Sequence, residues 1–445
     1  MPEADTTPAA RRFGKGWWGI GILGALLVAF ALFRIAAAQR LQSKIDDLKA
    51  DSRPGSAAEL DDYYKPVQDP SQNAALAIME ALMRIEAHAA YVDSQESRYK
   101  DRFWDHWNGD KPLEEAEAEA FRDLTSAMIA EIAEVKAAAA LPESRYSADL
   151  SAGHATILPH LSKIRSLSRV LRYEAIAGAL EGDSERAIEA VEAGFDLGHS
   201  LRNEPLLISG LVRIAGDVIT VQTLQGVVAT VELSDDQRSR VVEKMKRAMD
   251  AKPMALGMIG EAAVLPDTMS DLAALAGVGG SHGAPSGISL EAAILFVYGL
   301  TGLADVDAAY GLGRIESMYQ VIKERDPARR AVERRASSID DPIPKYYIGA
   351  RMLLPALSSS IKKEDGWQAM LATAIRALDP SGESYPDPRS GGELTTLDIE
   401  GRRYFCSLGP DGVDNGIGDP SVQKHRTDDQ YFFVPIRNAD GAVAE

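Results

Sequence analysis

The stretch WWGIGILGALLVAFALF, residues 17–33, decides the architecture that the sequence predicts, because it contains no charged residue over 17 positions. Continuing past Arg34 to Ala38 gives 22 residues, and at about 1.5 Å per residue this length matches the ~30 Å hydrocarbon core of a bilayer. Trp17 and Trp18 stand at one end, where aromatic side chains anchor at the interface, and the long side chain of Arg34 can snorkel to an interface. The sequence therefore predicts a transmembrane helix over residues 17–38.

Two interpretations of this segment stay open. The first is an uncleaved anchor, and the second is a signal peptide cut near residues 36–38, where small residues resemble a peptidase site. The apolar run is longer than the 7–15 residues of a usual signal-peptide core, and Arg34 precedes the small residues. Both features favour the anchor.

The orientation of the span does not follow from counting Lys and Arg, since three precede the uncharged run of residues 17–33 and five follow it within residues 34–53. Long domains translocate largely regardless of charge, and here a tail of residues 1–16 precedes a region of about 400 residues. We therefore expect a cytoplasmic tail over residues 1–16, a single pass over 17–38, and the bulk of the chain outside the cytoplasm.

Composition excludes several classes of protein. The 445 residues carry a formal net charge of −18, and because phosphate contacts need clustered cations, we expect no nucleic-acid partner. The chain has one cysteine, Cys406, which rules out an intramolecular disulfide framework and any metal site made only of cysteines. At 45% hydrophobic and 26% charged, the chain can bury hydrophobic cores.

The segment after the span predicts a mainly α fold. Residues 39–72 begin as a charged helix and pass through Ser52-Arg53-Pro54-Gly55, which is typical of a helix stop and linker. Residues 73–378 are rich in Ala, Leu, Glu and Arg, with apolar residues recurring at steps of three and four. We expect an antiparallel helical body over this range.

Three pieces of the body carry specific signals. Residues 171–201 predict two helices joined by a tight turn, with a cap at Ser184 and the small Ala187 where the helices approach. This resembles a tetratricopeptide-type hairpin; the alternative is any antiparallel helix pair in a bundle. Ser234 followed by Gln237 predicts a capping box. Residues 206–231 are apolar but contain Arg213 and Asp217, which favours a buried core helix over a membrane span.

The character of the sequence changes after Leu378. In residues 379–445, helix formers give way to Gly, Asp, Pro and alternating β-type residues. Residues 393–398, 401–408 and 430–436 predict three short strands, and a turn-rich acidic stretch precedes the last of them. We expect a small C-terminal β-meander with an acidic loop.

Several features of residues 382–433 occur in an order that invites comparison. They are Tyr385-Pro386-Asp387-Pro388, Gly391, Tyr404, Ser407-Leu408-Gly409-Pro410-Asp411-Gly412, Asp414 and the pair Asp428-Asp429. In this order they resemble the C-terminal part of the major pseudopilin of type II secretion. The whole chain, with YIGARMLLPALSSS at residues 347–360, resembles uncharacterised bacterial membrane-anchored proteins with this tail. The resemblance implies a location in the bacterial inner membrane and a connection to secretion machinery.

The same resemblance implies calcium in the acidic loop. Asp411 matches the loop aspartate, Leu408 offers a backbone carbonyl, and Asp428 or Asp429 matches the later acidic pair, while Asp414 and Asn415 are further oxygen donors. Calcium takes about six to eight oxygen ligands of these kinds, although the spacing is not that of an EF-hand. The alternative is that Asp and Asn are simply favourable turn residues beside Gly.

The sequence holds no HExxH, and its one G-x-S-x-G match, GGSHG at residues 279–283, lies in a glycine-rich stretch that follows no predicted strand. We therefore expect a non-enzymatic, membrane-anchored extracytoplasmic scaffold or protein-binding protein, with lipid contacts through residues 17–38 and a protein partner of unknown identity. The alternative is an envelope hydrolase whose carboxylate and histidine groups meet only between helices. A cleft in which His154 or His160 lies beside carboxylates would favour the alternative.

Overall fold

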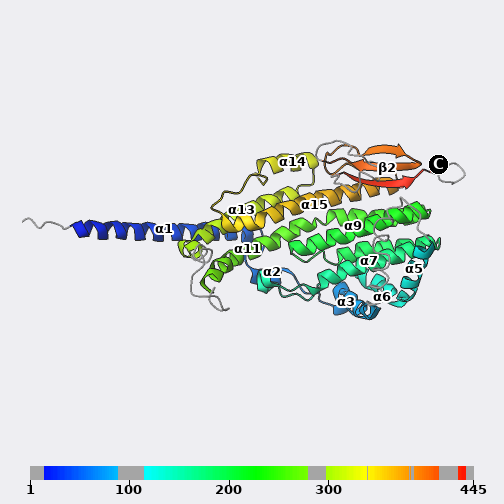
Figure 1. Ribbon diagram of the computed structural model, residues 1–445, viewed down its shortest axis with the longest axis horizontal. Helices are drawn as coiled ribbons and strands as arrows, with labels where there is room; N and C mark the ends of the chain where they lie inside the picture. Colours follow the sequence, from blue (N-terminus) through cyan, green and yellow to red (C-terminus); the bar gives the residue numbers. More distant parts are fainter. Residues whose placement is uncertain are drawn as a thin grey trace, which may run out of the picture.

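The computed structural model describes residues 15–88, 115–278, 297–337, 339–379, 381, 385–409 and 429–436. Over these residues the protein is mainly helical, with a small three-stranded sheet near its C-terminus (Figure 1). The α-helices are α1 (Lys15–Ala50), α2 (Ala57–Tyr63), α3 (Ala74–Ile85), α5 (Glu115–Ser126), α6 (Ile129–Ala139), α7 (Pro159–Leu180), α8 (Ser184–His199), α9 (Leu207–Thr230), α10 (Asp235–Asp250), α11 (Pro253–Val278), α13 (Leu303–Lys323), α14 (Pro327–Ala336) and α15 (Ile348–Leu378). The 3₁₀ segments are η1 (Pro70–Gln72), η2 (Glu86–His88) and η3 (Leu150–Ala155), and the strands are β1 (Thr395–Ile399), β2 (Arg402–Ser407) and β3 (Gln430–Pro435). The expected mainly α class with a C-terminal β-meander is confirmed.

Helix α1 is a single uninterrupted helix that joins the predicted span to the charged helix expected after it. Its first half projects from the body as a rod (Figure 1). The large apolar side chains of this half are exposed; Leu27, for example, is 60% exposed. By length and composition α1 can cross a membrane, as either an anchor or a signal sequence would.

The second half of α1 packs on α13. The contact begins at Arg34 and Ala37 and continues through Leu41, Ile45 and Leu48, so these residues recur at steps of three and four and share one helix face. Ala37 and Leu48 are buried, whereas the residues between Ile20 and Phe33 have no such cover. The uncharged run of the sequence ends at Arg34. At the same residue the exposed half of α1 ends and the half that packs on the body begins.

Arg34 fastens α1 to the body. Its Nη1 donates to the carbonyl oxygens of Gly299 at 2.7 Å and Leu300 at 2.8 Å. These carbonyls belong to the short helical stretch at residues 297–301, and Gly302 follows it with φ of 80°. The last carbonyls of a helix lack intrahelical partners, so a cation is favourable beside them. The guanidinium therefore has protein partners in addition to its predicted place near the membrane interface.

Helices α7 and α8 form the hairpin that the sequence predicts. Gly182 makes the turn with φ of 75°, and a Cβ added at Gly178 would lie 2.9 Å from the backbone nitrogen of Ala187, so the two helices touch closely there. The predicted cap at Ser184 is wrong. Asp183 is the N-cap and accepts from the backbone N–H of Arg186 at 3.0 Å, because a shorter turn places Ser184 in the first helical position.

Helix α9 packs against both α7 and α8 and is largely buried. It is the second described helix that is long and apolar enough to cross a membrane. However, 67% of its most apolar stretch is buried inside the body. The expectation of a core helix over residues 206–231 is therefore confirmed. The capping box that opens α10 is also present, with Ser234 and Gln237 bonded reciprocally.

The C-terminal sheet is antiparallel in the order β1-β2-β3. Phe432 on β3 is completely buried and belongs to the core of the helical body, on the side of α15. At the edge of β3 that does not pair with β2, the side chain of Gln225 in α9 bonds both the carbonyl oxygen of Phe433 at 3.1 Å and its N–H at 3.4 Å. The sheet is thus attached to the body by core packing and by a backbone hydrogen-bonding contact.

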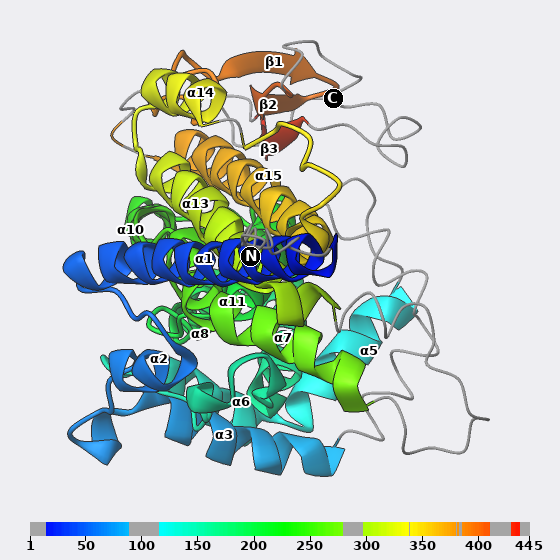
Figure 2. The ribbon, with the colours of Figure 1, turned by 90° about the vertical axis from the view of Figure 1, so that its left-hand side faces the viewer.

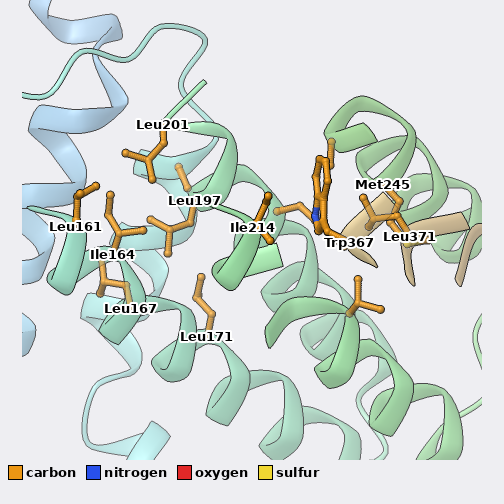
Figure 3. Packing of buried hydrophobic residues seen from close by; sticks show 14 of the residues in the cluster. Leu161, Ile164, Leu167, Leu171, Leu197, Leu201, Ile214, Met245, Trp367 and Leu371 are labelled. Atoms are coloured by element: carbon orange, nitrogen blue, oxygen red, sulfur yellow. The ribbon is translucent and has the colours of Figure 1, made fainter. Parts of the chain in front are cut away.

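The layers follow one another across the molecule in the order sheet, α15 with α13, α11, and finally α7 with α3 and α6 (Figure 2). A continuous hydrophobic core runs through them. Figure 3 shows part of it, where leucines of α7 and α8 and Ile214 of α9 are followed by Trp367 and Leu371 of α15 and Met245 of α10. The predicted boundary between body and C-terminal module coincides with the end of α15, but the two share this core.

Candidate functional site

An open groove of about 750 Å³ runs between α6 and α8. We call it the α6–α8 groove. Its lining residues are Ile129, Ile132, Ala133, Lys136, Ala137 and Ala140 from α6 and the residue after it, Glu174 from α7, Asp183, Arg186, Glu189, Glu192, Ala193 and Asp196 from α8 and its cap, and Lys244 from α10. This volume lies in the range that small-molecule sites occupy, and the groove is open to solvent along its length.

One wall of the groove is apolar and made of small side chains. Ile129, Ala133, Ala137 and Ala140 recur at steps of four, four and three, so they share a face of α6. Ile129 is 59% exposed, although an isoleucine is usually buried. This wall offers contact area that nothing in the described chain covers.

The other wall is charged and made by α8. Arg186 bonds Glu174 through Nη2 at 2.8 Å, and Lys136 reaches across the groove to Glu189 at 3.3 Å. The Glu189 side chain is 53% exposed, so its ion pair is weak and open to exchange with another cation. The carboxylates lining the groove outnumber its cations, which favours a ligand with basic groups.

The deeper end of this wall is held by α10. Lys244 bonds both carboxylate oxygens of Asp196, at 2.8 and 2.7 Å, and Arg247 also pairs with Asp196. Glu192 lies beside Arg240, with 3.2 Å between the Arg240 Nε and a Glu192 carboxylate oxygen. Burial raises the pKa of Glu192 from its ordinary value, against the opposing effect of Arg240 and Lys244.

Sequence reasoning missed this groove, because its two walls come from helices that are more than 40 residues apart at their starts. The available signal was the alanine-rich run at residues 137–140 beside a helix with acidic residues at positions 189, 192 and 196. Each pattern alone is ordinary for an amphipathic helix. Only their juxtaposition makes a groove.

Of the two histidines that would favour a hydrolase if they lay beside carboxylates in a cleft, His160 meets a carboxylate in the interior. His160 Nε2 lies 2.9 and 3.1 Å from the two carboxylate oxygens of Glu204, and Ser209 donates to Glu204 at 2.5 Å. Tyr146 stacks on the His160 ring with centroids 4.3 Å apart, and its N–H donates to the Tyr64 hydroxyl at 2.9 Å. These groups form a closed network that joins α2, α7 and the start of α9.

This network has no access to solvent. His160 and Glu204 are each 2% exposed and Ser209 is 0% exposed. The serine hydroxyl donates to the carboxylate rather than to the imidazole, so the three side chains are not arranged as the Ser–His pair of a serine hydrolase. The arrangement satisfies buried polar groups and holds three elements together.

His154 lines a small cavity of about 250 Å³, and its Nδ1 lies 3.8 Å from a carboxylate oxygen of Asp271 at the exposed surface. The cavity has mainly apolar walls, and Glu261 on α11 is its one acidic lining residue. Burial raises the pKa of Glu261 to about 7, while a hydrogen bond from the backbone of Leu207 opposes this effect. Leu207 is the first residue of α9, whose N-cap Leu206 has no side-chain cap, so Glu261 serves that helix end.

Two of the residues assigned to calcium lie in the described chain. The Leu408 carbonyl accepts from Arg389 Nη1 at 3.3 Å, and Asp429, which is buried, accepts from the Gly409 N–H at 2.6 Å. The other four, Asp411, Asp414, Asn415 and Asp428, lie outside the described residues. Within the described part of the chain, no three His, Cys, Asp or Glu side chains converge as metal ligands.

Comparison of the chain with protein-family models, with curated proteins and with solved structures finds no match.

Proposed function

We propose that this protein is a membrane-anchored binding protein or scaffold without enzymatic activity, which presents the α6–α8 groove to a partner on the outer side of the bacterial inner membrane. The observation that carries the proposal is the division of α1 at Arg34. Its first half is an uncovered apolar rod, and its second half is built into the body. A rod of this kind suits a bilayer, and the rigid joint suits a tether for the body.

The anchor is tested by placing charges on the rod. Leu23→Lys with Leu27→Lys introduces two cations near the centre of the span, each costing about 2.5–3.5 kcal/mol there. We expect this variant to leave the carbonate-washed membrane fraction that retains the wild type. The matched control is Met83→Lys with Val332→Lys, since these side chains are 61% and 65% exposed and lie on α3 and α14. Retention of the rod variant in the membrane would contradict the anchor.

The side of the membrane is tested separately. A reporter fused after Glu445 should be active only outside the cytoplasm, because the expected orientation places the N-terminal tail inside. Cytoplasmic activity of the reporter would overturn the orientation and leave the anchor in place.

The chemistry of the groove defines the partner segment as one with apolar side chains facing α6 and basic side chains facing α8. A fluorescent amphipathic peptide of Leu and Lys, added to the full chain in zwitterionic nanodiscs, should bind more tightly than its Leu and Glu counterpart. Ala137→Trp fills the groove and should weaken binding at least tenfold. Val332→Trp changes a side chain that is 65% exposed on α14 and does not line the groove, and it should leave binding unchanged. Equal affinity of the two variants would exclude the groove.

Two finer features belong to the same proposal. Stacking of helical hairpins in the manner of tetratricopeptide repeats is supported by the α7–α8 hairpin, onto which α9 packs. A role beside secretion machinery is supported by the order of residues shared with the major pseudopilin.

Calcium in the acidic loop is the third finer feature. Leu408 directly follows β2 and Asp429 directly precedes β3. Because β2 and β3 pair with each other, these two residues support a loop that is closed at its base. Calcium should raise the thermal unfolding midpoint of the full chain, and Asp411→Asn should remove that dependence while the exposed control Asp62→Asn retains it. Identical midpoints in calcium and in chelator would end this part of the proposal.

A hydrolase is the second candidate, and the cavity that holds His154 and Glu261 favours it. A carboxyl with a pKa near 7 is suited to general acid catalysis. If this candidate holds, Glu261→Gln abolishes hydrolysis of envelope substrates and leaves peptide binding intact. If the binding proposal holds, there is no hydrolysis for Glu261→Gln to abolish. Only Ala137→Trp then changes the measured function, because it weakens peptide binding.

A further inference from the structure

The joint between α1 and the body fixes which part of the body lies at the level of the membrane surface. About 20 helical residues cross the hydrocarbon core, so a span that starts near Trp17 ends close to Arg34. The Arg34 guanidinium is bonded to the carbonyls of Gly299 and Leu300. Residues 297–303 must therefore lie beside the end of the span.

The side chains presented at this level are apolar and exposed. Val297 is 50% exposed, Leu300 is 56% exposed and Leu303 is 37% exposed. They lie at steps of three on either side of the helix break at Gly302. Three exposed large apolar side chains within the seven residues 297–303 match the boundary between lipid headgroups and acyl chains.

An aromatic residue stands slightly further out. Tyr346 is 65% exposed beside the exposed Lys345, and its ring lies 4.5 Å from that of Tyr347. Tyr347 stacks on Tyr310 of α13 with 4.0 Å between the ring centroids, and α13 packs on α1, where Arg40 lies six residues beyond Arg34 and opposes the rise in the pKa of Tyr347. Tyrosine and lysine are residues that favour the membrane–water interface, and six helical residues correspond to about 9 Å.

We propose that Val297, Leu300, Leu303 and Tyr346 form a membrane collar, which rests on the same bilayer that holds α1. This inference rests on the proposed anchor and adds a second lipid contact to it. With two contacts, the body cannot swing freely about α1, so the α6–α8 groove has a fixed direction relative to the membrane. The occupant of the collar is the lipid interface rather than a protein partner, because a collar bonded to the end of the span is held against the bilayer surface.

The test places an environment-sensitive fluorophore on single introduced cysteines of the full chain in nanodiscs, with and without brominated lipid. The positions are Leu27→Cys in the rod, Leu300→Cys in the collar and Val332→Cys on α14. Val332 is the matched control, since it is apolar and 65% exposed but lies away from α1. The wild-type chain serves as the labelling blank, because its own cysteine, Cys406, is buried.

The expected result is strong quenching at position 27, at least twofold quenching at position 300 and none at position 332. Quenching at 27 with position 300 indistinguishable from 332 would overturn the collar and leave the anchor intact. Absence of quenching at position 27 would overturn the anchor, and the collar with it. Quenching at all three positions would show general adsorption of the body and would also overturn the collar.

Discussion

At the scale of single residues, the body buries a carboxyl group in surroundings that disfavour its ionised form. Asp217 on α9 is 0% exposed, and its carboxylate lies near Arg213 and the indole N–H of Trp367 without a hydrogen bond of normal geometry to either. Burial raises the pKa of Asp217 to about 7, although Arg213 one turn earlier opposes the shift. A Cβ at Gly198 would meet the Asp217 carboxylate at 2.5 Å, so a glycine on α8 is what makes room for it.

This burial predicts a pH dependence of stability. The ordinary pKa of the side chain is 3.8, so between about pH 4 and 7 the folded protein keeps a proton that the unfolded chain releases. The contribution of Asp217 to the free energy of unfolding is therefore fully present below pH 4 and is lost as the pH rises to 7. Glu261 and Glu364, whose pKa values burial raises to about 7, act in the same direction. Burial lowers the pKa of His199 to about 3, which acts in the opposite direction.

Asp217→Asn isolates one of these contributions. The slope of the free energy of unfolding against pH, measured by denaturant titration between pH 4 and 7, should become less negative by up to about 1.4 kcal/mol per pH unit. Asp62→Asn, at an exposed position, controls for the loss of one carboxyl. An unchanged slope in Asp217→Asn would mean that the carboxyl is not buried as described.

At the scale of elements, helix crossings in the body depend on glycines that admit a neighbouring backbone. α11 crosses the segment before α9 at Gly257 and Gly260, where an added Cβ would collide with the backbone of Leu207 and Pro205. A backbone atom cannot rotate away as a side chain can. The crossing is therefore specified by the absence of a side chain at these positions.

Gly260→Ala should lower the free energy of unfolding by about 1–3 kcal/mol, because the two segments must separate to admit the methyl group. Gly313→Ala is the matched control. Gly313 lies within α13 with no atom within 4 Å of an added Cβ, so alanine should raise stability there by about 0.5–1 kcal/mol through helix propensity. Chemical denaturation measures both, and equal effects of the same sign would refute the crossing.

At the scale of the whole molecule, the C-terminal sheet and the helical body share one core, so they should unfold together. Phe432 is 0% exposed and packs in the cluster that also holds Trp367 and Leu371. Phe432→Ala should lower the free energy of unfolding of the entire body by about 3–5 kcal/mol. Calorimetry should show one transition in the wild type and in the variant. Two separate transitions, with only the smaller one shifted, would indicate an independent C-terminal module.

The sequence by itself determined the features that depend on local pattern. The 17 uncharged residues predict α1, the Ser234–Gln237 pair predicts the cap of α10, and alternation of β-type residues predicts the three strands. These signals lie within one element, where propensity and periodicity act. The predicted cap of α8, Ser184, lies one residue after the observed cap, Asp183. Both are good capping residues, and only the backbone geometry of the turn distinguishes them.

Tertiary structure alone decided which distant residues meet. Nothing near Glu204 in the sequence points to His160, and nothing near Arg34 points to Leu300, since these pairs are 44 and 266 residues apart. Likewise, the groove exists only because α6 lies against α8. Packing brings such residues together through many small contacts along the chain, and no local pattern encodes that sum. The apolar first half of α1 could therefore be predicted from the sequence, whereas the groove and the contact of Arg34 with residues 299 and 300 could not.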